Sequence, residues 1–307
     1  ELLSMPPEMN TATTQANPNT PISQLGHCCT CCRFLFVAFC LFASFVIIKL
    51  TNKDGTVTEI KIPEGTKIEI IPDGKSNEER DFEIAKGVHM KFCWVPAGKA
   101  TLGTPIAAKE RDIDEIEHAF ETRGFWLGKY EVTQEQWTAL MDNNPSQFKG
   151  GKMPVETVSW DDCQAFITKC AVKNLKVRLP HEDEWEYACR GGLGNKQAFH
   201  WGDTLNGDKA NCNGTYPSGT ETKGPYLERS AEVGSYERHV PHPWGLCDLH
   251  GNVSEWCDNL HSKESLSRVV RGGGWISESG RCRSAVRNRA NPTFRLYSIG
   301  FRLALVL

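Results

Sequence analysis

The feature that most constrains this chain is its C-terminal segment, which combines glycines, a tryptophan and a series of arginines. The segment reads RGGGW at residues 271–275, CRSAVRNR at 282–289 and IGFR at 299–302. Residues 268–302 contain eight arginines, no lysine and a single acidic residue, Glu278. A buried guanidinium group needs a carboxylate partner, whereas exposed arginines beside aromatic side chains are typical of a binding surface. The segment therefore predicts internal ion pairs, a basic binding surface, or both.

The composition places the chain among ordinary globular proteins. Of its 307 residues, 39% are hydrophobic and 24% are charged, which is enough apolar material for a buried core. The net charge of -3 gives no reason to expect a nucleic-acid partner, and we expect none. Residues 1–32 are rich in small polar residues and proline, so we expect a disordered N-terminal tail.

Residues 34–48 form an apolar run without a charge. At about 1.5 Å per residue such a helix is shorter than the ~30 Å hydrocarbon core of a bilayer, but flanking Arg33 and Lys49 can reach the headgroups. We therefore predict a short transmembrane or membrane-anchor helix over residues 33–50, with a buried core helix as the alternative. The chain is expected to be a single-pass membrane protein, and the side of the membrane that carries its globular part is left open.

The next residues alternate in polarity and then become charged. Residues 57–62 and 67–71 have the period-two pattern of strands, so we predict a β-hairpin over 51–74, followed by a linker over 75–89. From residue 90 to 307, short apolar runs are separated by glycine, proline and asparagine. Helical spacing and capping residues predict helices at 133–141, 159–172 and 181–189.

Six motifs follow one another in this last region, and together they carry a resemblance. They read GFWLGKYEVT at 124–133, PVETVSW at 154–160, VRLPHEDEWEYA at 177–188, GNVSEW at 251–256, RGG at 271–273 and GFR at 300–302. In this order and spacing they resemble the formylglycine-generating enzyme, or sulfatase-modifying factor, domain family. The resemblance covers about residue 90 to the C-terminus. It implies an α+β fold, irregular and C-type-lectin-like, with low secondary-structure content.

The resemblance leaves the activity open, because the family contains copper oxidases, binding domains and variable proteins diversified by retroelements. The oxidases hold copper(I) with two cysteines placed after the glycine–aromatic turn. In this chain the interval from Gly274 to Cys282 holds one cysteine, and Ser277 occupies the first position. A hydroxyl group does not bind copper(I), which prefers thiolates. Copper is therefore not expected, and Cys282 is read as a small core residue that is only a weak catalytic candidate.

The resemblance also implies a structural calcium ion. The matching ligands are the side chains of Asp248 and Glu255 and the carbonyl groups of Gly251 and Val253, an all-oxygen set that suits Ca²⁺. A second family site would use Asn211 and the carbonyl group of the next residue. The alternative is that these residues only brace a turn.

The arginines are divided between two predicted roles. Arg271, Arg287 and Arg302 stand at motif positions and are expected to pair internally with Glu131, Glu184 or Glu186. The remaining ones, together with nearby aromatic and polar residues, are expected to form a ligand-binding surface. Its predicted members are Trp275, Ser277, Arg281, Arg283, Asn288, Arg289, Phe294, Arg295 and Tyr297.

The sequence thus predicts a membrane-tethered, non-catalytic domain of this family that is stabilised by calcium. Its expected partners are a protein, peptide or small-molecule ligand at the C-terminal surface and the membrane through residues 33–50. Two alternatives stay open: a sulfatase-modifying oxidoreductase of the formylglycine-generating type, and a retroelement-diversified variable binding protein.

Overall fold

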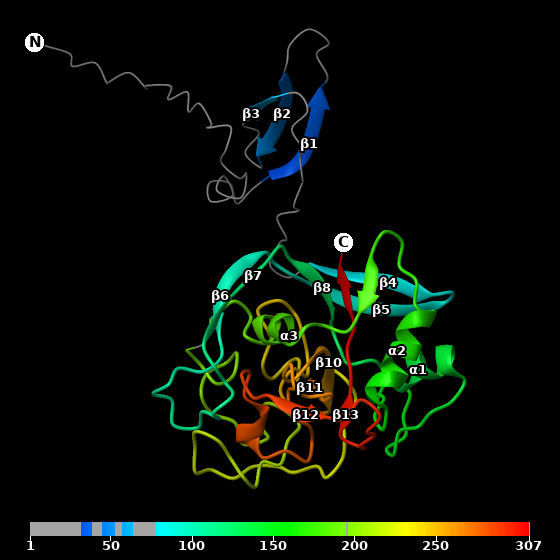
Figure 1. Cartoon of the computed structure of the whole chain (residues 1–307), viewed down its shortest axis with the longest axis vertical. Helices are drawn as coiled ribbons and strands as arrows, with labels where there is room; N and C mark the ends of the chain where they lie inside the picture. Colours follow the sequence, from blue (N-terminus) through cyan, green and yellow to red (C-terminus); the bar gives the residue numbers. More distant parts are fainter. Residues whose placement is uncertain (1–31, 39–44, 53–56, 64–77, 195, 307) are drawn as a thin grey trace, which may run out of the picture. The chain divides into compact units, whose positions relative to one another are not determined.

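The computed structural model describes residues 32–38, 45–52, 57–63, 78–194 and 196–306 (Figure 1). The chain divides into two compact units, Glu1–Ile70 and Ile71–Leu307. The predicted disordered tail, apart from Cys32, and the predicted strand at 67–71 lie outside the described residues.

The first unit contains a three-stranded antiparallel sheet, in the order β1 (Cys32–Ala38), β2 (Phe45–Asn52) and β3 (Val57–Pro63). The helix predicted over residues 33–50 is therefore wrong, because both ends of that range are strands. Phenylalanine, valine and isoleucine fit strands well, and an apolar run without a period does not discriminate a helix from a strand. Among the described residues, no helix is long and apolar enough to cross a membrane.

The first strand of the hairpin predicted over 51–74 pairs with a different strand from the expected one. The predicted strand at 57–62 is present as β3, but it pairs with β2, so that Val57 lies opposite Thr51 and Pro63 opposite Phe45. The alternation of residues 57–62 identified a strand, whereas the apolar residues of its partner had been assigned to a helix.

The second unit is built from three sheets and three short helices. A five-stranded sheet has the order β4-β5-β8-β14-β9, a four-stranded sheet the order β12-β11-β10-β13, and β6 pairs with β7. The strand near the C-terminus, β14, lies between β8 and β9 and joins distant parts of the sequence. The bounds are β4 Glu79–Ala85, β5 Val88–Val95, β6 Gly98–Leu102, β7 His118–Thr122, β8 Phe125–Gly128, α1 Gln134–Met141, α2 Trp160–Lys169, β9 Lys176–Arg178, α3 Glu182–Cys189, β10 Ser254–Leu260, β11 Arg268–Arg271, η2 (3₁₀) Ser279–Cys282, β12 Asn288–Ala290, β13 Ile299–Gly300 and β14 Ala304–Val306.

Strand β4 and the start of β5 lie in the range predicted to be a linker, which is a correction. Ile84 is fully buried, and the ring of Phe82 contacts those of Phe92 and Trp126 at centroid distances of 5.6 and 5.3 Å. Phe82 and Ile84 alternate with charged residues along the strand. The high charge of this segment concealed its period-two pattern.

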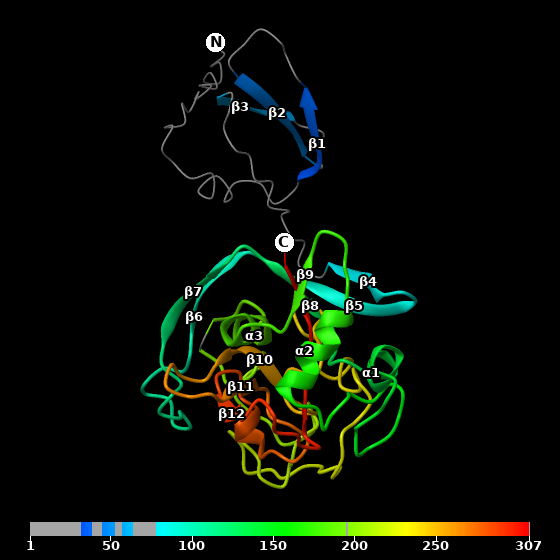
Figure 2. The ribbon, with the colours of Figure 1, turned by 45° about the vertical axis from the view of Figure 1, so that its right-hand side comes forward.

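The core lies on both sides of β5. Side chains of this strand alternate between two apolar clusters, with Phe92 and Trp94 in one and Cys93 and Val95 in the other. The first cluster also contains residues of α1 and α2, and the second contains residues of α3. In Figures 1 and 2, α1 lies beside α2, and α3 lies apart from them. The sheet thus joins the helical pair to the part of the unit that carries the C-terminal motifs.

The helices form where their caps predict them. Thr133 and His181 cap α1 and α3, each within a complete capping box. Helix α2 begins after Ser159 as expected but ends at Lys169, three residues before the predicted end. Residues 196–253 contain only turns, bends and isolated bridges, which agrees with the expected low content of regular structure.

Candidate functional site

The turn from Asp248 to Glu255, predicted to bind calcium, leads from the irregular segment into β10. Asp248 and Asn252 adopt left-handed backbone conformations, with φ of 57° and 58°. A β-carbon on Gly251 would collide with the carbonyl oxygen of Asn211, so this position needs glycine. The Asn252 N–H donates to the same Asn211 carbonyl at 2.8 Å. The structure thus brings Asn211, predicted for a second site, against the first turn.

Glu255 is engaged by an arginine rather than left free for a metal ion. Its two carboxylate oxygens accept hydrogen bonds from Nε and Nη2 of Arg302, both at 2.7 Å, and Trp185 Nε1 donates at 2.7 Å. Both charged side chains are fully buried. A bidentate pair of this kind already compensates the carboxylate charge. Glu255 therefore does not fit the predicted role of calcium ligand.

Asn252 organises the polar groups beneath this turn. Its side chain donates to Glu131 Oε1 at 3.1 Å and accepts from Asn211 Nδ2 at 3.1 Å and from the Ala231 N–H at 2.8 Å. Two buried oxygens, Glu131 Oε2 and Asn211 Oδ1, have no hydrogen-bond partner. Burial and the neighbouring Asp248 carboxylate raise the pKa of Glu131 well above its usual value, and burial raises the pKa of Asp248 to about 6. These oxygens would accept a proton or a cation.

A complete metal site of acidic, histidine or cysteine ligands is not formed in the described part of the chain. No group of three or more such side chains there is arranged to hold an ion. Of the predicted calcium ligands, Asp248 accepts the Gly234 N–H, while Gly251 and Val253 are buried in the turn. The oxygens that remain near the turn are those of Asp248, Glu131, Asn211 and backbone carbonyl groups.

The glycine–aromatic turn is closed by Ser277, the residue at the first oxidase cysteine position. Its hydroxyl oxygen accepts the Gly274 N–H at 3.0 Å. Trp275 is buried and packs against Phe148 and Tyr297 at centroid distances of 5.5 and 5.6 Å. Ser277 and Trp275 therefore stabilise the turn, and Trp275 presents little surface to a ligand.

Cys282 has a second thiol beside it, which the sequence analysis missed. Cys282 and Cys212 belong to one buried cluster. Cys212 Sγ also lies 3.3 Å from Ser279 Oγ, within the 3₁₀ helix that ends at Cys282. The argument that Cys282 is a solitary thiol is therefore wrong. The two cysteines are far apart in the sequence, and no local pattern connects them.

Access to these thiols is restricted. Cys212 is 1% exposed and Cys282 is 0% exposed. The other cysteines of the second unit are also free thiols, and all of them are buried except the half-buried Cys170. The second thiol is present, but it does not face an open cleft.

An acidic connection between β6 and β7, residues 103–117, covers much of the arginine series. Arg283 is buried and pairs with the fully buried Glu115, with Nη1 and Nη2 at 2.9 and 2.8 Å from its oxygens. Arg281 pairs with Asp112 at 2.5 Å. These two predicted ligand-binding arginines are therefore neutralised internally, by carboxylates that are distant in the sequence.

The motif arginines pair internally, with partners that differ in part from the expected ones. Arg271 contacts Glu186 at 2.5 Å, which is one of the predicted partners. Arg287 instead holds Glu182 through two hydrogen bonds of 2.6 and 2.8 Å, and Glu184 pairs with Arg178. Burial opposes ionisation of Glu182 and Glu186, but the arginines hold the pKa of both carboxyl groups below their usual values.

The other predicted binding residues lie nearer the surface, around β12 and the turn after it. Arg289 and Phe294 are exposed, and Asn288 and Tyr297 are half-buried. Arg295 is exposed and pairs with Asp162 at 2.7 Å. The exposed part of the predicted surface is therefore smaller than the sequence suggested.

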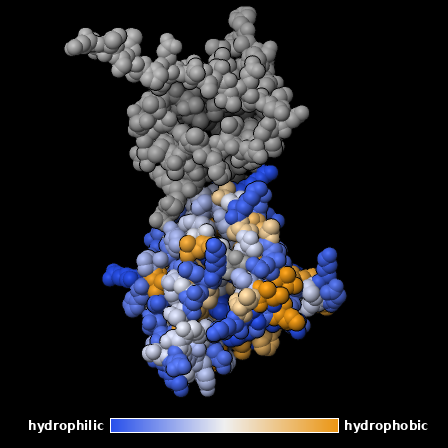
Figure 3. Space-filling model, turned by 90° about the vertical axis from the view of Figure 1, so that its left-hand side faces the viewer, coloured by the Kyte–Doolittle hydropathy of each residue, from blue (hydrophilic) through white to orange (hydrophobic). Residues whose placement is uncertain are grey.

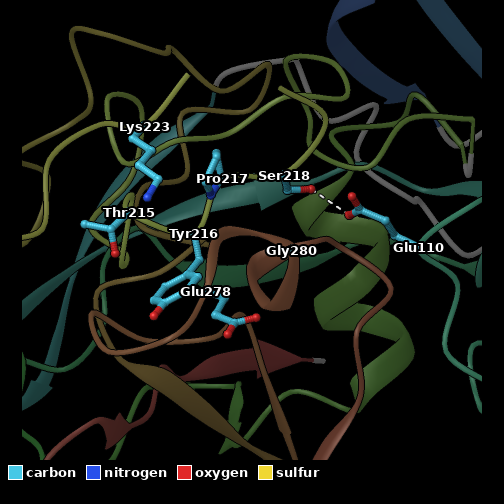
Figure 4. Close-up of a pocket in the computed structure, with 8 residues that line it drawn as sticks. All are labelled: Glu110, Thr215, Tyr216, Pro217, Ser218, Lys223, Glu278 and Gly280. Carbon is cyan, nitrogen blue, oxygen red and sulfur yellow. Dashed lines mark hydrogen bonds between the residues drawn. The ribbon is translucent and has the colours of Figure 1, made fainter. Parts of the chain in front are cut away.

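A surface pocket of about 450 Å³ lies beside the glycine–aromatic turn (Figure 4). Its polar lining includes Glu110 and Glu278, the hydroxyl groups of Thr215 and Ser218, and Lys223. Figure 4 shows the dashed hydrogen bond from Ser218 to Glu110, which measures 2.7 Å. The pocket combines carboxylates, hydroxyl groups and an ammonium group, so it suits a polar ligand. Its complete lining is Glu110, Thr215, Tyr216, Pro217, Ser218, Lys223, Glu278 and Gly280.

The acidic connection also exposes apolar side chains. Ile106, Ile113 and Ile116 are 85, 90 and 64% exposed. Figure 3 shows apolar groups gathered in separate patches on an otherwise mainly hydrophilic face. The carboxylates of this segment point toward the arginines while these isoleucines face solvent, which gives the segment two chemically different sides.

Three histidines form a cluster that the sequence analysis also missed, in which His242 and His250 are buried and His200 is half-buried. The ring of His200 lies 4.7 Å from that of His242 and 5.2 Å from that of His250, measured between centroids. Neither ring nitrogen of His200 has a hydrogen-bond partner. Burial lowers the pKa of His200 to about 4 and that of His242 to about 3. The cluster is therefore neutral at physiological pH.

Comparison with known families and proteins agrees with these motifs. The model of a family described as "Sulfatase-modifying factor enzyme 1-like domain" matches residues 81–307. The chaperone protein LppX of Paenibacillus barcinonensis is 32% identical over 197 residues, which cover 50% of this chain and 70% of that protein. The formylglycine-generating enzyme of Streptomyces coelicolor is 35% identical over 173 residues, 49% of this chain and 52% of the enzyme.

A relative whose name marks it as inactive is similar to the same degree. The inactive C-alpha-formylglycine-generating enzyme 2 of Bos taurus is 34% identical over 160 residues, 50% of each chain. This chain therefore spans about half the length of the two formylglycine-generating relatives.

Solved structures share the fold at low sequence identity. Treponema denticola variable protein 1 superposes with a TM-score of 0.59, and PvdO from Pseudomonas aeruginosa with 0.60. Each is 24% identical, and each superposition covers 74% of this chain and 98% of the other. At this identity the likeness concerns the fold alone.

Proposed function

The chain belongs to the sulfatase-modifying factor family, and from that premise we propose that its second unit binds a ligand or protein without catalysing oxidation. The observation that carries this proposal is the burial of the thiols. Ser277 replaces one oxidase cysteine and closes a turn, while Cys282 and Cys212 are 0 and 1% exposed. A peptide-modifying oxidase must bring its substrate to the reacting sulfur, and a buried thiol pair does not meet that requirement.

The ligand site is proposed at the pocket together with the exposed residues of the C-terminal surface. Glu278 and Gly280, which line the pocket, belong to the same interval that the sequence identified. Glu110, Glu278 and Lys223 give the lining two negative charges and one positive charge. We infer that the pocket prefers a polar ligand that carries an amine or several hydroxyl groups, and that a protein or peptide partner would also contact Arg289 and Phe294.

Calcium and membrane attachment are further parts of the proposal. The unpartnered oxygens Glu131 Oε2 and Asn211 Oδ1 favour a cation near the Asp248 turn, although Glu255 is taken by Arg302. Asp248, Asn211 and carbonyl groups would then be the donors, with oxygen chemistry that suits calcium. Attachment to a membrane stays a prediction, and a spanning helix at residues 33–50 is not part of it.

A second candidate function is favoured by the presence of Cys212 and Cys282 in one buried cluster. A pair of thiolates is the donor set that copper(I) prefers, so the family's oxidoreductase activity stays the alternative. This alternative requires that η2 move so that a substrate reaches the sulfur atoms. A retroelement-diversified variable protein is the third possibility, and the genomic neighbourhood would identify it.

Binding and oxidation are separated by one pair of measurements. The first screens a peptide and glycan array with the wild-type chain and with Gly280→Arg, which fills the pocket. Glu121→Gln, outside the pocket and the C-terminal surface, serves as the control. We expect binding that Gly280→Arg abolishes and Glu121→Gln retains. The second measurement is oxygen uptake with a cysteine peptide and copper(I). Uptake by the wild type that a Cys282→Ser variant lacks would replace the binding proposal with the oxidase alternative.

A further inference from the structure

A second pocket, of about 360 Å³, lies between two segments of the second unit that are distant in the sequence. One wall comes from residues 149–153, just before the PVETVSW motif, and the other from residues 227–232 of the irregular segment. The Val233 N–H donates to the Lys152 carbonyl at 3.0 Å and ties the two walls together. The volume falls in the range of small-molecule pockets, about 300–1,000 Å³. The two pockets share no lining residue.

Two asparagines fix the backbone of the second wall. Asn211 Nδ2 donates to the Arg229 carbonyl at 2.9 Å. Asn252 binds both backbone groups of Ala231: its Oδ1 accepts the N–H at 2.8 Å, and its Nδ2 donates to the carbonyl at 3.3 Å. Ser230 lies between these anchored residues and is 1% exposed. The backbone on both sides of Ser230 is therefore held in place.

The hydroxyl group of Ser230 lacks a partner, although this residue lines the pocket. Its Oγ atom is buried and makes no hydrogen bond within residues 78–194 and 196–306. Nearly all buried polar groups of native proteins are hydrogen-bonded, because an unpaired one is unfavourable. The anchored backbone cannot shift to supply a partner, whereas the side chain can turn to another staggered rotamer. A ligand in the pocket is therefore the partner that this hydroxyl group can gain.

Two exposed cations of the lining are positioned to hold an anion. The guanidinium of Arg229 lies over the Phe148 ring, 5.8 Å from its centroid, and has no carboxylate partner in the part of the chain that the structure describes. Such stacking uses the flat face of the guanidinium and leaves its in-plane N–H groups available. Lys149 Nζ donates to the Asn144 carbonyl at 2.7 Å, which orients the ammonium group and leaves two of its three donors. Both cations can therefore donate to a bound anion.

The charge of the lining indicates how much negative charge the ligand carries. Lys149 and Arg229 contribute two positive charges and Glu232 one negative charge, which leaves a net charge of +1. A single carboxylate matches this charge, whereas a doubly charged phosphate would be repelled by Glu232. Carboxylates also accept two parallel hydrogen bonds from one guanidinium group.

The rest of the lining is apolar. Met153 is 5% exposed, and Leu227 is 47% exposed, so both walls offer apolar surface that a ligand can cover. We propose that this pocket binds a small organic monocarboxylate. The two cations and the Ser230 hydroxyl group bind its carboxylate, and its apolar arm packs against Met153 and Leu227. This site is separate from the pocket beside the glycine–aromatic turn, and it does not depend on the function proposed for that pocket.

The test uses the full chain and hexanoate as the probe, with binding followed by saturation-transfer NMR. We expect saturable binding of hexanoate. Hexanamide has a similar arm without the charge, and acetate has the charge without the arm, so each should bind about tenfold more weakly or less well still.

Variants assign the binding to this pocket. Arg229→Gln should weaken hexanoate binding about tenfold or more. Arg238→Gln removes the same charge from an exposed position of the same segment and should leave the affinity unchanged. Gly280→Arg, which fills the other pocket, should also leave it unchanged, so the two sites are tested separately.

Ser230→Ala separates a ligand-binding serine from a structural one. It should weaken hexanoate binding, while the melting temperature of the ligand-free protein stays the same or rises, because an unpaired buried hydroxyl group is removed. A lower melting temperature with unchanged affinity would show that Ser230 is structural and would remove it from the site.

Three results would overturn the proposal: no saturable binding of hexanoate to the wild type, equal affinity for hexanoate and hexanamide, or equal affinity of Arg229→Gln and Arg238→Gln for hexanoate. Tighter binding of hexyl phosphate than of hexanoate would contradict the ligand class. Circular dichroism verifies that each variant is folded, and Lys149→Gln, at a second exposed cation, repeats the test if Arg229→Gln is not.

Discussion

Replacement of Arg302 by methionine tests the most buried ion pair of the domain. The Arg302 guanidinium is fully buried, and besides its two bonds to Glu255 it donates to the carbonyl groups of Gly128 and Cys247, both at 2.9 Å. Removal of one partner from a buried pair typically costs about 3–5 kcal/mol, because the other charge is left uncompensated. We therefore expect a loss within that range.

Urea unfolding followed by tryptophan fluorescence measures the loss, because Trp185 and Trp256 are fully buried. A second variant, Arg302→Met with Glu255→Gln, removes both charges and should be more stable than Arg302→Met alone.

The reasoning would be refuted if Arg302→Met cost less than about 1 kcal/mol, the value typical of exposed pairs. It would also fail if the double variant were no more stable than the single one. If added calcium restored the stability of Arg302→Met, this would show instead that Glu255 can serve as a cation ligand.

Three further predictions follow from the same structure. Glu115→Gln should destabilise the domain by about 3–5 kcal/mol, because it removes the bidentate partner of buried Arg283 and leaves only the Glu110 carboxylate, 3.8 Å away. Glu121→Gln, in an exposed pair with Lys99, should cost no more than about 1 kcal/mol. Equal losses in urea unfolding would contradict this. His200 and His242 stay neutral in the folded state, while the same side chains of the unfolded chain are protonated near pH 6.5. Stability should therefore fall as the pH drops from about 6.5 toward 4, by up to about 1.4 kcal/mol per pH unit for each histidine. His242→Phe should make the dependence of stability on pH shallower, whereas His239→Gln, at an exposed position, should leave it unchanged. Identical slopes for the two variants would show that the histidine cluster does not cause the dependence. A calcium chelator should lower the melting temperature of the wild-type chain, and an unchanged midpoint would remove calcium from the account.

The elements predicted correctly are those whose signals are local. Thr133 and His181 each lie three residues before the Gln or Glu that completes a capping box, so the starts of α1 and α3 could be read directly. Glycine at positions 251 and 272 matches left-handed backbone that presses against Asn211 and Trp185. The family motifs identified the rest of the architecture.

The incorrect predictions concern a segment without a periodic pattern and contacts between residues that are distant in the sequence. The apolar run at 33–50 contains no period, so its length suggested a helix where the structure has strands. The partners of Arg281 and Arg283 come from residues 110–115. Cys212 and Cys282 share a cluster because the irregular segment folds back on η2. No local pattern encodes these contacts. The predicted binding surface was therefore too large, and the predicted isolation of Cys282 was incorrect.

The central claim is that this member of the family binds rather than oxidises, and oxygen consumption tests it most directly. The full chain, loaded with copper(I) and supplied with a cysteine peptide and reductant, is compared with Cys282→Ser in an oxygen electrode. The account predicts the same background uptake for both proteins and an unmodified peptide. Uptake well above that background, lost in Cys282→Ser and accompanied by conversion of the peptide cysteine, would contradict it.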